Sequence, residues 1–286
     1  MIYDCFLFNN ELEILDIRLN ELAHVVDKFV LVESTVTHSI KPKPLYFDKH
    51  KKKFEQFKHK IIHIVVKDTP DVSLPWIVND YQFSQMKRGL STCKPNDIVL
   101  FGDVDEIPKA EAIKKGIRLQ GKLKVFSQRL CQYYLNYMAH PSRPWHGTRM
   151  ATYRELSRYP TLWIAKFSPF DTIIPDGGWH FSYMGGIKRI REKFSDMTHQ
   201  EYNNDRYNTP EKIEHAIREG RDLAYMGWKF RMERIEELPL YVRSHQDKLA
   251  HLLLQTPPQH HDLILQWLEL KHILRVKFLR KIRKFV

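Results

Sequence analysis

The sequence predicts an α/β fold in which a mostly parallel, Rossmann-like sheet is flanked by helices. Short apolar strand candidates alternate with amphipathic helix candidates in the first third of the chain, and polar residues follow several of these strands. The chain has 286 residues and 43% hydrophobic content, which suits one large domain or two abutting lobes with a buried core. Because such sheets bind ligands at the carboxyl ends of their strands, we expect the functional residues there.

The first strand is predicted over residues 2–8, an apolar run that two asparagines break. Residues 11–26 then repeat apolar side chains at helical spacing, which predicts an amphipathic helix. These apolar positions are Leu12, Leu15, Leu19, Leu22 and Val26. Residues 29–32 are the next apolar run, which predicts a short buried strand that ends at Glu33.

Two further strand and helix pairs complete the first half of the chain. A lysine-rich helix is predicted over residues 48–58, after a loop marked by two prolines, and a strand over residues 61–66 follows it. Residues 76–92 are predicted to be helical after a second proline-marked loop. Residues 98–101 are another buried strand, which leads directly into an acidic segment.

The second half has a less regular pattern. Residues 124–137 have strand character, whereas residues 140–180 contain five prolines and are predicted to be loop-rich. Residues 186–195 and 210–226 are predicted to be helices. Residues 262–286 repeat apolar side chains at three- or four-residue steps with basic residues on much of the other face, which predicts a basic, helical C-terminal extension.

The formal net charge of +12 favours an acidic partner such as nucleic acid, an anionic lipid or a phosphorylated substrate. The excess is concentrated in residues 41–60 and 271–284 rather than along one continuous groove. The basic tail suits an anionic membrane surface, and the alternatives are docking on its own protein or a dimer contact. The sequence shows no zinc-ligand spacing, RNA-recognition block or clear helix-turn-helix, so no nucleic-acid partner is expected.

The three cysteines Cys5, Cys93 and Cys131 are an odd number without metal-ligand spacing, which is typical of reduced thiols in a cytosolic protein. The first apolar run has no basic segment before it and Asp4 interrupts it, so no signal peptide is expected. No apolar stretch reaches the length of a transmembrane helix. We therefore expect a cytoplasmic protein. The basic tail is expected to hold it at the inner face of a membrane.

The strongest local signal for chemistry is the pair Asp103 and Asp105, directly after the strand at residues 98–101. Two carboxylates at this spacing can approach one hard cation, Mn²⁺ or Mg²⁺, which also binds phosphate oxygens. In sugar transfer from a nucleotide donor, such a cation neutralises the charge that develops on the diphosphate leaving group. The alternative is a turn or a helix cap, because Asp-x-Asp is common there and Pro108 suits a helix start.

Residues 103–108 (DVDEIP) resemble the acidic motif of glycosyltransferase family 17, and other segments are similar to that family too. The similar segments, in the order in which the family has them, are residues 3–11, 32–34 with 43–47, 76–81 and 178–183. The joint match is far more specific than any one segment. It covers most of the chain but not the tail after about residue 240.

The resemblance implies a GT-A type fold, a UDP-N-acetylglucosamine donor and inversion at the anomeric carbon. We accordingly expect a GT-A domain over residues 1–250, with a nucleotide-binding part at 1–108 and an acceptor part at 109–250, followed by the helical tail at 251–286. The chain departs from the best-known animal members, which bisect N-glycans, in its lack of an amino-terminal anchor and in Gly102, where an acid can stand. The expected acceptor is therefore a glycan or glycolipid at the cytoplasmic membrane face.

The resemblance and the strand-end positions together suggest the site residues. The expected metal ligands are Asp103, Asp105 and His180. Contacts to the donor are expected from Asn9, Glu11, Glu33, Lys43, Asp80, Arg88 and Trp179, with Lys87 beside them. Inversion needs a general base for the attacking hydroxyl, and Glu106 and Asp176 are the two open candidates. Each of these residues has an ordinary structural alternative in a loop, on a helix face or in the core.

Rival functions are transfer of a different sugar from UDP, a metal-dependent phosphohydrolase, and a non-enzymatic basic protein that binds nucleic acid or membranes. Phosphohydrolases with an Asp-x-Asp nucleophile usually place it after the first strand and follow it with Thr or Val. Here the motif comes after a later strand and Glu106 follows it. That placement favours the glycosyltransferase.

Overall fold

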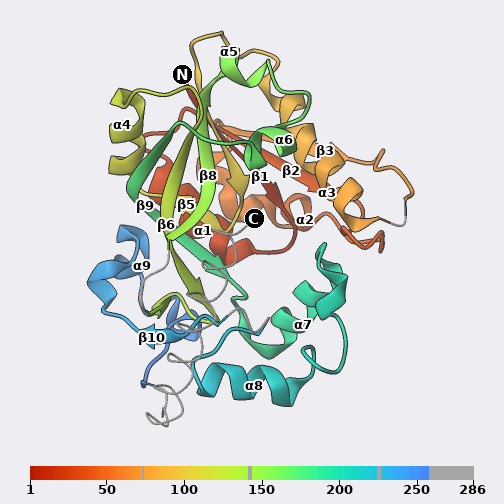
Figure 1. The fold of residues 1–286 in the computed structure, drawn as a ribbon, viewed down its shortest axis with the longest axis vertical. Coiled ribbons are helices and arrows are strands. Elements are labelled where there is room, and N and C mark those ends of the chain that lie inside the picture. Colours follow the sequence, from red (N-terminus) through yellow and green to blue (C-terminus); the bar gives the residue numbers. More distant parts are fainter. Residues whose placement is uncertain (73, 141–143, 224–226, 258–286) are drawn as a thin grey trace, which may run out of the picture.

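The computed structural model describes residues 1–72, 74–140, 144–223 and 227–257. Within these residues, the strands form one 10-stranded sheet, and helices flank it (Figure 1). The α/β fold class predicted from the sequence is therefore confirmed.

The first half of the chain forms the parallel part of the sheet. Its strands are β1 (Ile2–Phe8), β2 (Lys28–Ser34), β3 (Ile61–Val66) and β4 (Ile98–Asp103). They lie in the order β4-β1-β2-β3, and every neighbouring pair is parallel. All four predicted strands are confirmed. Their carboxyl ends share one edge of the sheet, and β4 brings Asp103 to that edge.

Helices connect these strands much as predicted. They are α1 (Leu12–Leu22), α2 (Tyr46–His50), the 3-10 helix η1 (Lys51–Phe57), α3 (Pro75–Ser84), the 3-10 helix η2 (Gln85–Leu90) and α4 (Ala110–Arg118). The helices predicted at 11–26, 48–58 and 76–92 are confirmed, although the last two continue as 3-10 helix. α4 is an additional helix that starts shortly after Pro108.

The second half adds strands where residues 140–180 were predicted to be loop-rich. Its strands are β5 (Glu106–Pro108), β6 (Lys124–Gln132), β7 (Tyr137–Ala139), β8 (Pro144–Thr152), β9 (Thr172–Ser182) and β10 (Phe230–Met232). The prediction was wrong because proline and glycine here occupy positions that strands tolerate. Pro144 is the first residue of β8, and Gly178 has φ of 129° where the β5 backbone comes close.

The strand pairing of this half is mixed. β8 is antiparallel to both β4 and β6, whereas β9 is parallel to β6 and antiparallel to β5. β7 is antiparallel to β6 and β10. A mostly parallel sheet is therefore correct for the first half of the chain and wrong for the second.

Most helices of the second half are short, apart from α7 (Gly186–Asp196) and α8 (Pro210–Arg218). The short ones are α5 (Tyr153–Leu156), α6 (Leu162–Phe167), the 3-10 helix η3 (Gln200–Tyr202), the 3-10 helix η4 (Ile235–Glu237), α9 (Leu240–Ser244) and the 3-10 helix η5 (Ala250–Leu252). The helix predicted at 186–195 is confirmed. The one predicted at 210–226 ends at Arg218, just before Gly220 with φ of 60°.

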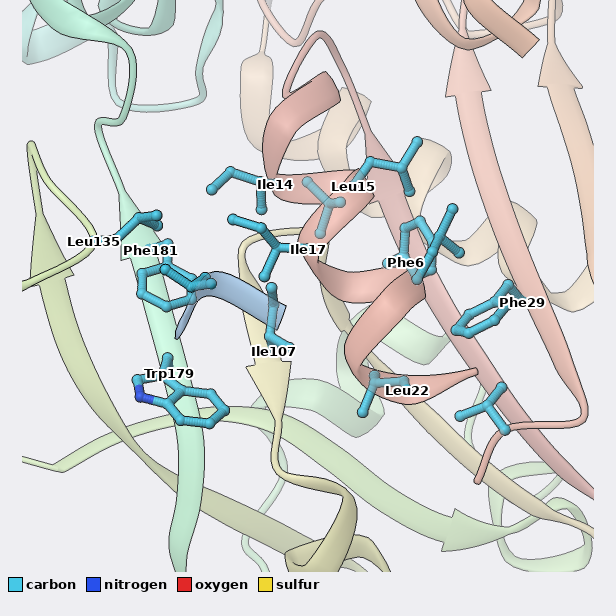
Figure 2. Packing of buried hydrophobic residues seen from close by; sticks show 14 of the residues in the cluster. Phe6, Ile14, Leu15, Ile17, Leu22, Phe29, Ile107, Leu135, Trp179 and Phe181 are labelled. Carbon is cyan, nitrogen blue, oxygen red and sulfur yellow. The ribbon is translucent and has the colours of Figure 1, made fainter. Parts of the chain in front are cut away.

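Two apolar clusters bury the two faces of the parallel strands. Along β1, alternate side chains enter opposite clusters, since Phe6 packs with α1 whereas Cys5 packs with residues of η2 and α6. Figure 2 shows Ile107 of β5 and Phe181 of β9 in the same cluster as α1. The core thus reaches directly under the segment that follows β4.

Three other expectations concern thiols, membranes and the tail. Cys5, Cys93 and Cys131 are all free cysteines. Among the described helices, none has both the length and the apolar character to cross a bilayer. The helix predicted at residues 262–286 lies outside the described residues, and of the tail at 251–286 only residues 251–257 are described.

Candidate active site

A cavity of about 470 Å³ opens at the edge where the parallel strands end. Residues that follow β1 and β2 line one part of it, and residues of β8 and α6 line another. The segment after β4 lies between them, because β4 separates β1 from β8 in the sheet. Seven of the sequence-predicted residues line this cavity, namely Asn9, Glu11, Lys43, Asp103, Asp105, Glu106 and His180.

The acidic turn, residues 103–106, is held from the core side by a buried ion pair. Arg18 of α1 binds both carboxylate oxygens of Asp4, with its Nε 2.8 Å and its Nη2 2.6 Å from them. Neither side chain is exposed. Nη1 of Arg18 also donates to three backbone carbonyl oxygens of the turn, at 3.0, 3.1 and 2.7 Å. A rigid guanidinium with this many bonds fixes the course of the turn.

Asp105 is a buried carboxylate that faces His180 and Lys193. Its Oδ1 lies 3.5 Å from Nε2 of His180, and its Oδ2 accepts a 2.8 Å hydrogen bond from Nζ of Lys193 on α7. The register of β5 and β9 pairs Glu106 with His180, which brings the imidazole beside the turn. Burial alone would raise the pKa of Asp105, but Lys193 and His180 outweigh burial and hold this pKa well below its usual range.

A second lysine joins the other two carboxylates of the turn. Nζ of Lys166, on α6, lies 2.6 Å from Oδ2 of Asp103 and 3.1 Å from Oε2 of Glu106. Glu106 is buried, and its Oε1 accepts a 2.9 Å hydrogen bond from Nε1 of Trp145. Burial alone would lower the pKa of Lys166, but the two carboxylates raise it above its usual range. Lys166 is therefore a cation at neutral pH.

The absence of an acid before the motif has a steric reason. A Cβ atom on Gly102 would lie 2.6 Å from Oε2 of Glu106 and 3.2 Å from Cα of Thr148. Any side chain at position 102 would therefore displace Glu106 from its contact with Lys166. The small residue before the motif and the buried glutamate within it belong together.

Asp105 and His180 are the residues that could hold a divalent cation, with further ligands supplied by a substrate. Within the described residues, no group of three His, Cys, Asp or Glu side chains is arranged to hold a metal ion. Mg²⁺, however, is usually bound through one or two carboxylates together with substrate phosphates. Two ligands of an octahedral ion at about 2.1 Å lie about 3 Å apart, and Asp105 and His180 approach to 3.5 Å. The fit requires Lys193 to leave Oδ2 of Asp105.

Three donor-binding candidates line the same cavity. Oε2 of Glu11 accepts hydrogen bonds from the backbone N–H groups of Asn9 and Asn10, at 3.2 and 3.0 Å, and so shapes the end of β1. Lys43 follows β2, and its buried Nζ has no hydrogen-bond partner among the described residues. Burial lowers the pKa of Lys43, although nearby carboxylates oppose this. Lys43 therefore supplies a buried amine whose hydrogen-bonding capacity a ligand can satisfy.

Three other donor-binding candidates do not line the cavity. Glu33 is fully buried and accepts a 2.8 Å hydrogen bond from a backbone N–H of α2. Asp80 accepts a 3.1 Å hydrogen bond from a serine one turn later, and Arg88 forms a surface ion pair with Asp68. All three have structural partners that account for them.

Asp176 and Trp179 also lie away from the cavity. Asp176 is 60% exposed and pairs with Lys109. Trp179 is buried, donates a 2.8 Å hydrogen bond to a backbone carbonyl oxygen, and packs near Phe181 in the cluster of Figure 2. The structure thus separates these two residues of β9 from their neighbour His180.

Sequence reasoning missed the cations that hold the acidic turn. One signal for Arg18 was present, because it lies at helical spacing from Leu15 and Leu22 on the apolar side of its helix. A charged residue there needs a buried partner, and Asp4 inside an apolar strand was the available one. Lys166 and Lys193 had no such signal.

Aromatic side chains line the cavity on the α6 side. The ring centroid of Trp163 lies 6.1 Å from that of Trp76 and 4.5 Å from that of Phe167. Trp76 is 45% exposed and Phe167 is 62% exposed. Exposed aromatic faces at a cavity suit the apolar face of a flat or ring-shaped ligand.

Comparisons with known proteins point to one family. The family model described as glycosyltransferase family 17 matches residues 1–261. The human beta-1,4-mannosyl-glycoprotein 4-beta-N-acetylglucosaminyltransferase is 32% identical over 113 residues, which are 37% of this chain and 21% of the relative. The mouse protein of the same name is 31% identical over the same shares of both chains. The chain thus matches about a fifth of the length of these curated relatives.

Proposed function

The chain belongs to glycosyltransferase family 17, and from this premise we propose that it transfers N-acetylglucosamine from UDP-N-acetylglucosamine to a hydroxyl of a glycan or glycolipid. The transfer is proposed to invert the anomeric carbon. The name of the curated relatives supports the choice of donor sugar. The fold is proposed to be of the GT-A type, with a nucleotide-binding part at about residues 1–108 and an acceptor part at about residues 109–250.

One observation carries the proposal. The acidic turn places Asp103 and Asp105 inside a cavity at the carboxyl ends of parallel strands, where α/β sheets bind nucleotides. β1 and β2 lie on one side of β4, so we assign the nucleotide to that side, with Lys43 as the diphosphate contact. β8 lies on the other side of β4, and we assign the acceptor to it.

Asp105 and His180 are the residues that we propose to hold Mn²⁺ or Mg²⁺. A bound cation of this kind supplies neutralisation of the charge that develops on the diphosphate leaving group. The chain itself keeps Asp105 ionised, because Lys193 pairs with it inside a buried site. Asp103, which is bonded to Lys166, is the second proposed carboxylate of the site.

Glu106 is the candidate base that lines the cavity. Its two oxygens already accept hydrogen bonds from Trp145, Lys166 and the backbone N–H of Asp103. A base role requires one of these donors to move away, whereas a positioning role requires no movement. The pH profile of kcat for Glu106→Gln separates the two roles, because loss of the base removes the acidic limb and loss of a positioning residue lowers kcat without changing the profile.

The aromatic side of the cavity supports a sugar acceptor. The exposed rings of Trp76 and Phe167 offer faces on which a sugar ring can stack. A glycolipid acceptor on the inner face of a membrane is also proposed, with the basic tail at residues 262–286 as the membrane contact and a cytoplasmic location for the protein. That part of the proposal depends on the sequence of the tail alone.

Calorimetric titration of UDP-N-acetylglucosamine, with UDP-glucose for comparison, tests the donor and the cation together. Titrations are made with Mn²⁺ and with EDTA, on wild-type protein and on Asp105→Ala. We expect binding that needs Mn²⁺, prefers the N-acetyl sugar and is lost in Asp105→Ala. Asp205→Ala is the matched control, because Asp205 is an exposed aspartate away from the cavity.

Three results would count against parts of the proposal. Absence of UDP-sugar binding to folded wild-type protein in the presence of Mn²⁺ would exclude the donor assignment. Equal binding in EDTA would exclude the cation from donor binding while leaving the UDP-sugar in place. Equal affinity for UDP-N-acetylglucosamine and UDP-glucose would be compatible with a glycosyltransferase but would exclude a preference for the N-acetyl sugar.

A further inference from the structure

Four lysine and arginine side chains line the cavity, and they form two classes. Lys166 and Lys193 bind the carboxylates of the acidic turn. Lys43 and Arg149 differ, because Nζ of Lys43 and both Nε and Nη1 of Arg149 are buried without a hydrogen-bond partner among the described residues. The second class therefore has donors that a ligand can satisfy.

Arg149 of β8 is the more constrained of these two cations. The residue is 6% exposed, and its Cζ lies 5.0 Å from the centroid of the Phe170 ring. A ring face attracts a cation but does not accept hydrogen bonds from all its N–H groups. An arginine keeps its proton in a protein, so its buried donors carry a cost in free energy until they find an acceptor. A bound oxyanion removes that cost.

The position of Arg149 separates it from the proposed diphosphate contact. Arg149 pairs in register with Phe101, two residues before Asp103, on the side of β4 away from β1. Lys43 follows β2 on the other side. Burial lowers the pKa of Arg149, and Glu106 is the carboxylate that raises it most. Its oxygens already accept hydrogen bonds from Trp145 and Lys166. Arg149 thus faces the part of the cavity assigned to the acceptor.

We propose that Arg149 binds an anionic group on the acceptor, a sugar carboxylate or a phosphate, close to the hydroxyl that receives the transferred sugar. The planar guanidinium matches either oxyanion through paired N–H donors. Trp163 lines the same cavity as Arg149, so the sugar that carries the anion has an aromatic face to stack on. This inference depends on the proposed function, which assigns the donor diphosphate to the side of Lys43.

Ligand-observed NMR titrations on protein saturated with UDP and Mg²⁺ test the assignment. The probes are methyl β-D-glucuronide, inorganic phosphate and, as the neutral counterpart of the glucuronide, methyl β-D-glucoside. We expect at least one anion to bind better than the glucoside. Arg149→Met should then weaken binding of that anion by about ten- to a hundredfold, as expected for hydrogen bonds to a charged group. The anion that binds more tightly identifies the carboxylate or the phosphate as the preferred group.

Two further variants make the result specific. Arg149→Lys keeps the charge without the planar pair of donors, so it should bind the anion with intermediate affinity. Arg158→Met removes a 59% exposed arginine on the surface and should leave all titrations unchanged. The thermal midpoint and the UDP affinity of each variant establish that it is folded.

Two outcomes would overturn the proposal. One is equal anion binding by wild type and Arg149→Met. The other is anion binding that wild type shows without UDP and loses when UDP is present, together with weaker UDP binding in Arg149→Met, which would assign Arg149 to the donor diphosphate. Failure of the proposed function is distinguishable from failure of this inference. In the first case wild-type protein does not bind UDP-N-acetylglucosamine, but titrations of the anions without UDP still report on Arg149.

Discussion

The acidic turn has a core side and a cavity side, and each carries a carboxylate bound by a basic side chain. On the core side, Arg18 and Asp4 are both 0% exposed. On the cavity side, the side chain of Asp105 is 6% exposed and that of Lys193 is 29% exposed. The N–O distances are similar, at 2.6 and 2.8 Å. The two pairs therefore differ in access and in the number of bonds, because Arg18 binds both oxygens of Asp4 whereas Lys193 binds one oxygen of Asp105.

This difference assigns the pairs to different tasks. Arg18 also donates to three carbonyl oxygens of the turn, so no ligand from solution can replace it. Lys193 makes one hydrogen bond to Asp105 through a long, flexible side chain, so a cation can replace it. The core pair fixes where Asp105 lies, and the cavity pair keeps Asp105 charged for a ligand.

The largest effect is expected from breaking the core pair. Arg18→Met leaves the Asp4 carboxylate unpaired in the core, so the free energy of unfolding should fall by about 3–5 kcal/mol. Urea unfolding followed by circular dichroism measures it. Lys58→Met is the matched control, since it breaks an exposed pair with Glu55 that contributes only about 0–1 kcal/mol.

A double variant sharpens the same measurement. Asp4→Leu combined with Arg18→Met replaces the buried ions with apolar groups, which often restores stability. Here we expect only partial recovery, because the carbonyl oxygens of the turn still lose their donor. Full recovery would show that the bonds from Arg18 to the turn contribute little.

A smaller effect is expected from breaking the cavity pair. Lys193→Met leaves Asp105 without its lysine, so in EDTA the free energy of unfolding should fall by about 1–3 kcal/mol. Mn²⁺ should then stabilise Lys193→Met more than wild type, because the ion no longer competes with a lysine. Thermal unfolding at several Mn²⁺ concentrations measures this. Equal stabilisation of the two proteins by Mn²⁺ would mean that the ion does not replace Lys193 at Asp105.

The smallest effect concerns acid. The folded pKa of Asp105 is below its usual value of about 3.9, so its contribution to stability is fully present above that value and is lost as the pH falls from there through the lower folded pKa. Between about pH 5 and pH 2, in EDTA, the unfolding free energy of Asp105→Asn should therefore fall less steeply than that of wild type.

A surface aspartate provides the comparison for the acid series. Arg88 lowers the pKa of Asp68 to about 2 through a hydrogen bond, but this pair is exposed. Added salt should weaken the contribution of Asp68 more than that of Asp105, because solvent screens exposed pairs. A salt dependence that is equal for Asp68→Asn and Asp105→Asn would mean that Asp105 is more accessible than its burial indicates.

The parallel half of the fold was predictable because its signals are local. Each strand from β1 to β4 is a short apolar run, and the helices between them repeat apolar residues at helical spacing. β8 and β9 were not predictable in this way, because proline and glycine interrupt their patterns and their partners are distant in sequence. β8 pairs with β4, whose residues lie about fifty positions earlier.

The site divides in the same manner. Asp103 and Asp105 follow a strand end and were found from their position, and His180 was found through its resemblance to a family segment. Lys166 and Lys193 come from helices 63 and 88 positions away from the carboxylates that they bind. Nothing in the sequence around Arg149 indicates that its side chain is buried, and only the fold shows it. Contacts between distant segments, rather than motif residues, are what one sequence does not reveal.

The register between β5 and β9 also limits how the length of the chain can change. Side chains alternate along a strand, so one residue inserted or deleted between Gly178 and His180 would turn the imidazole to the opposite face. Such a shift in register would also place another residue at position 178. Only glycine fits there, because an added Cβ would lie 2.1 Å from the carbonyl oxygen of Ile107. We therefore expect this short ladder to tolerate neither an insertion nor a deletion, whereas surface loops can be lengthened or shortened.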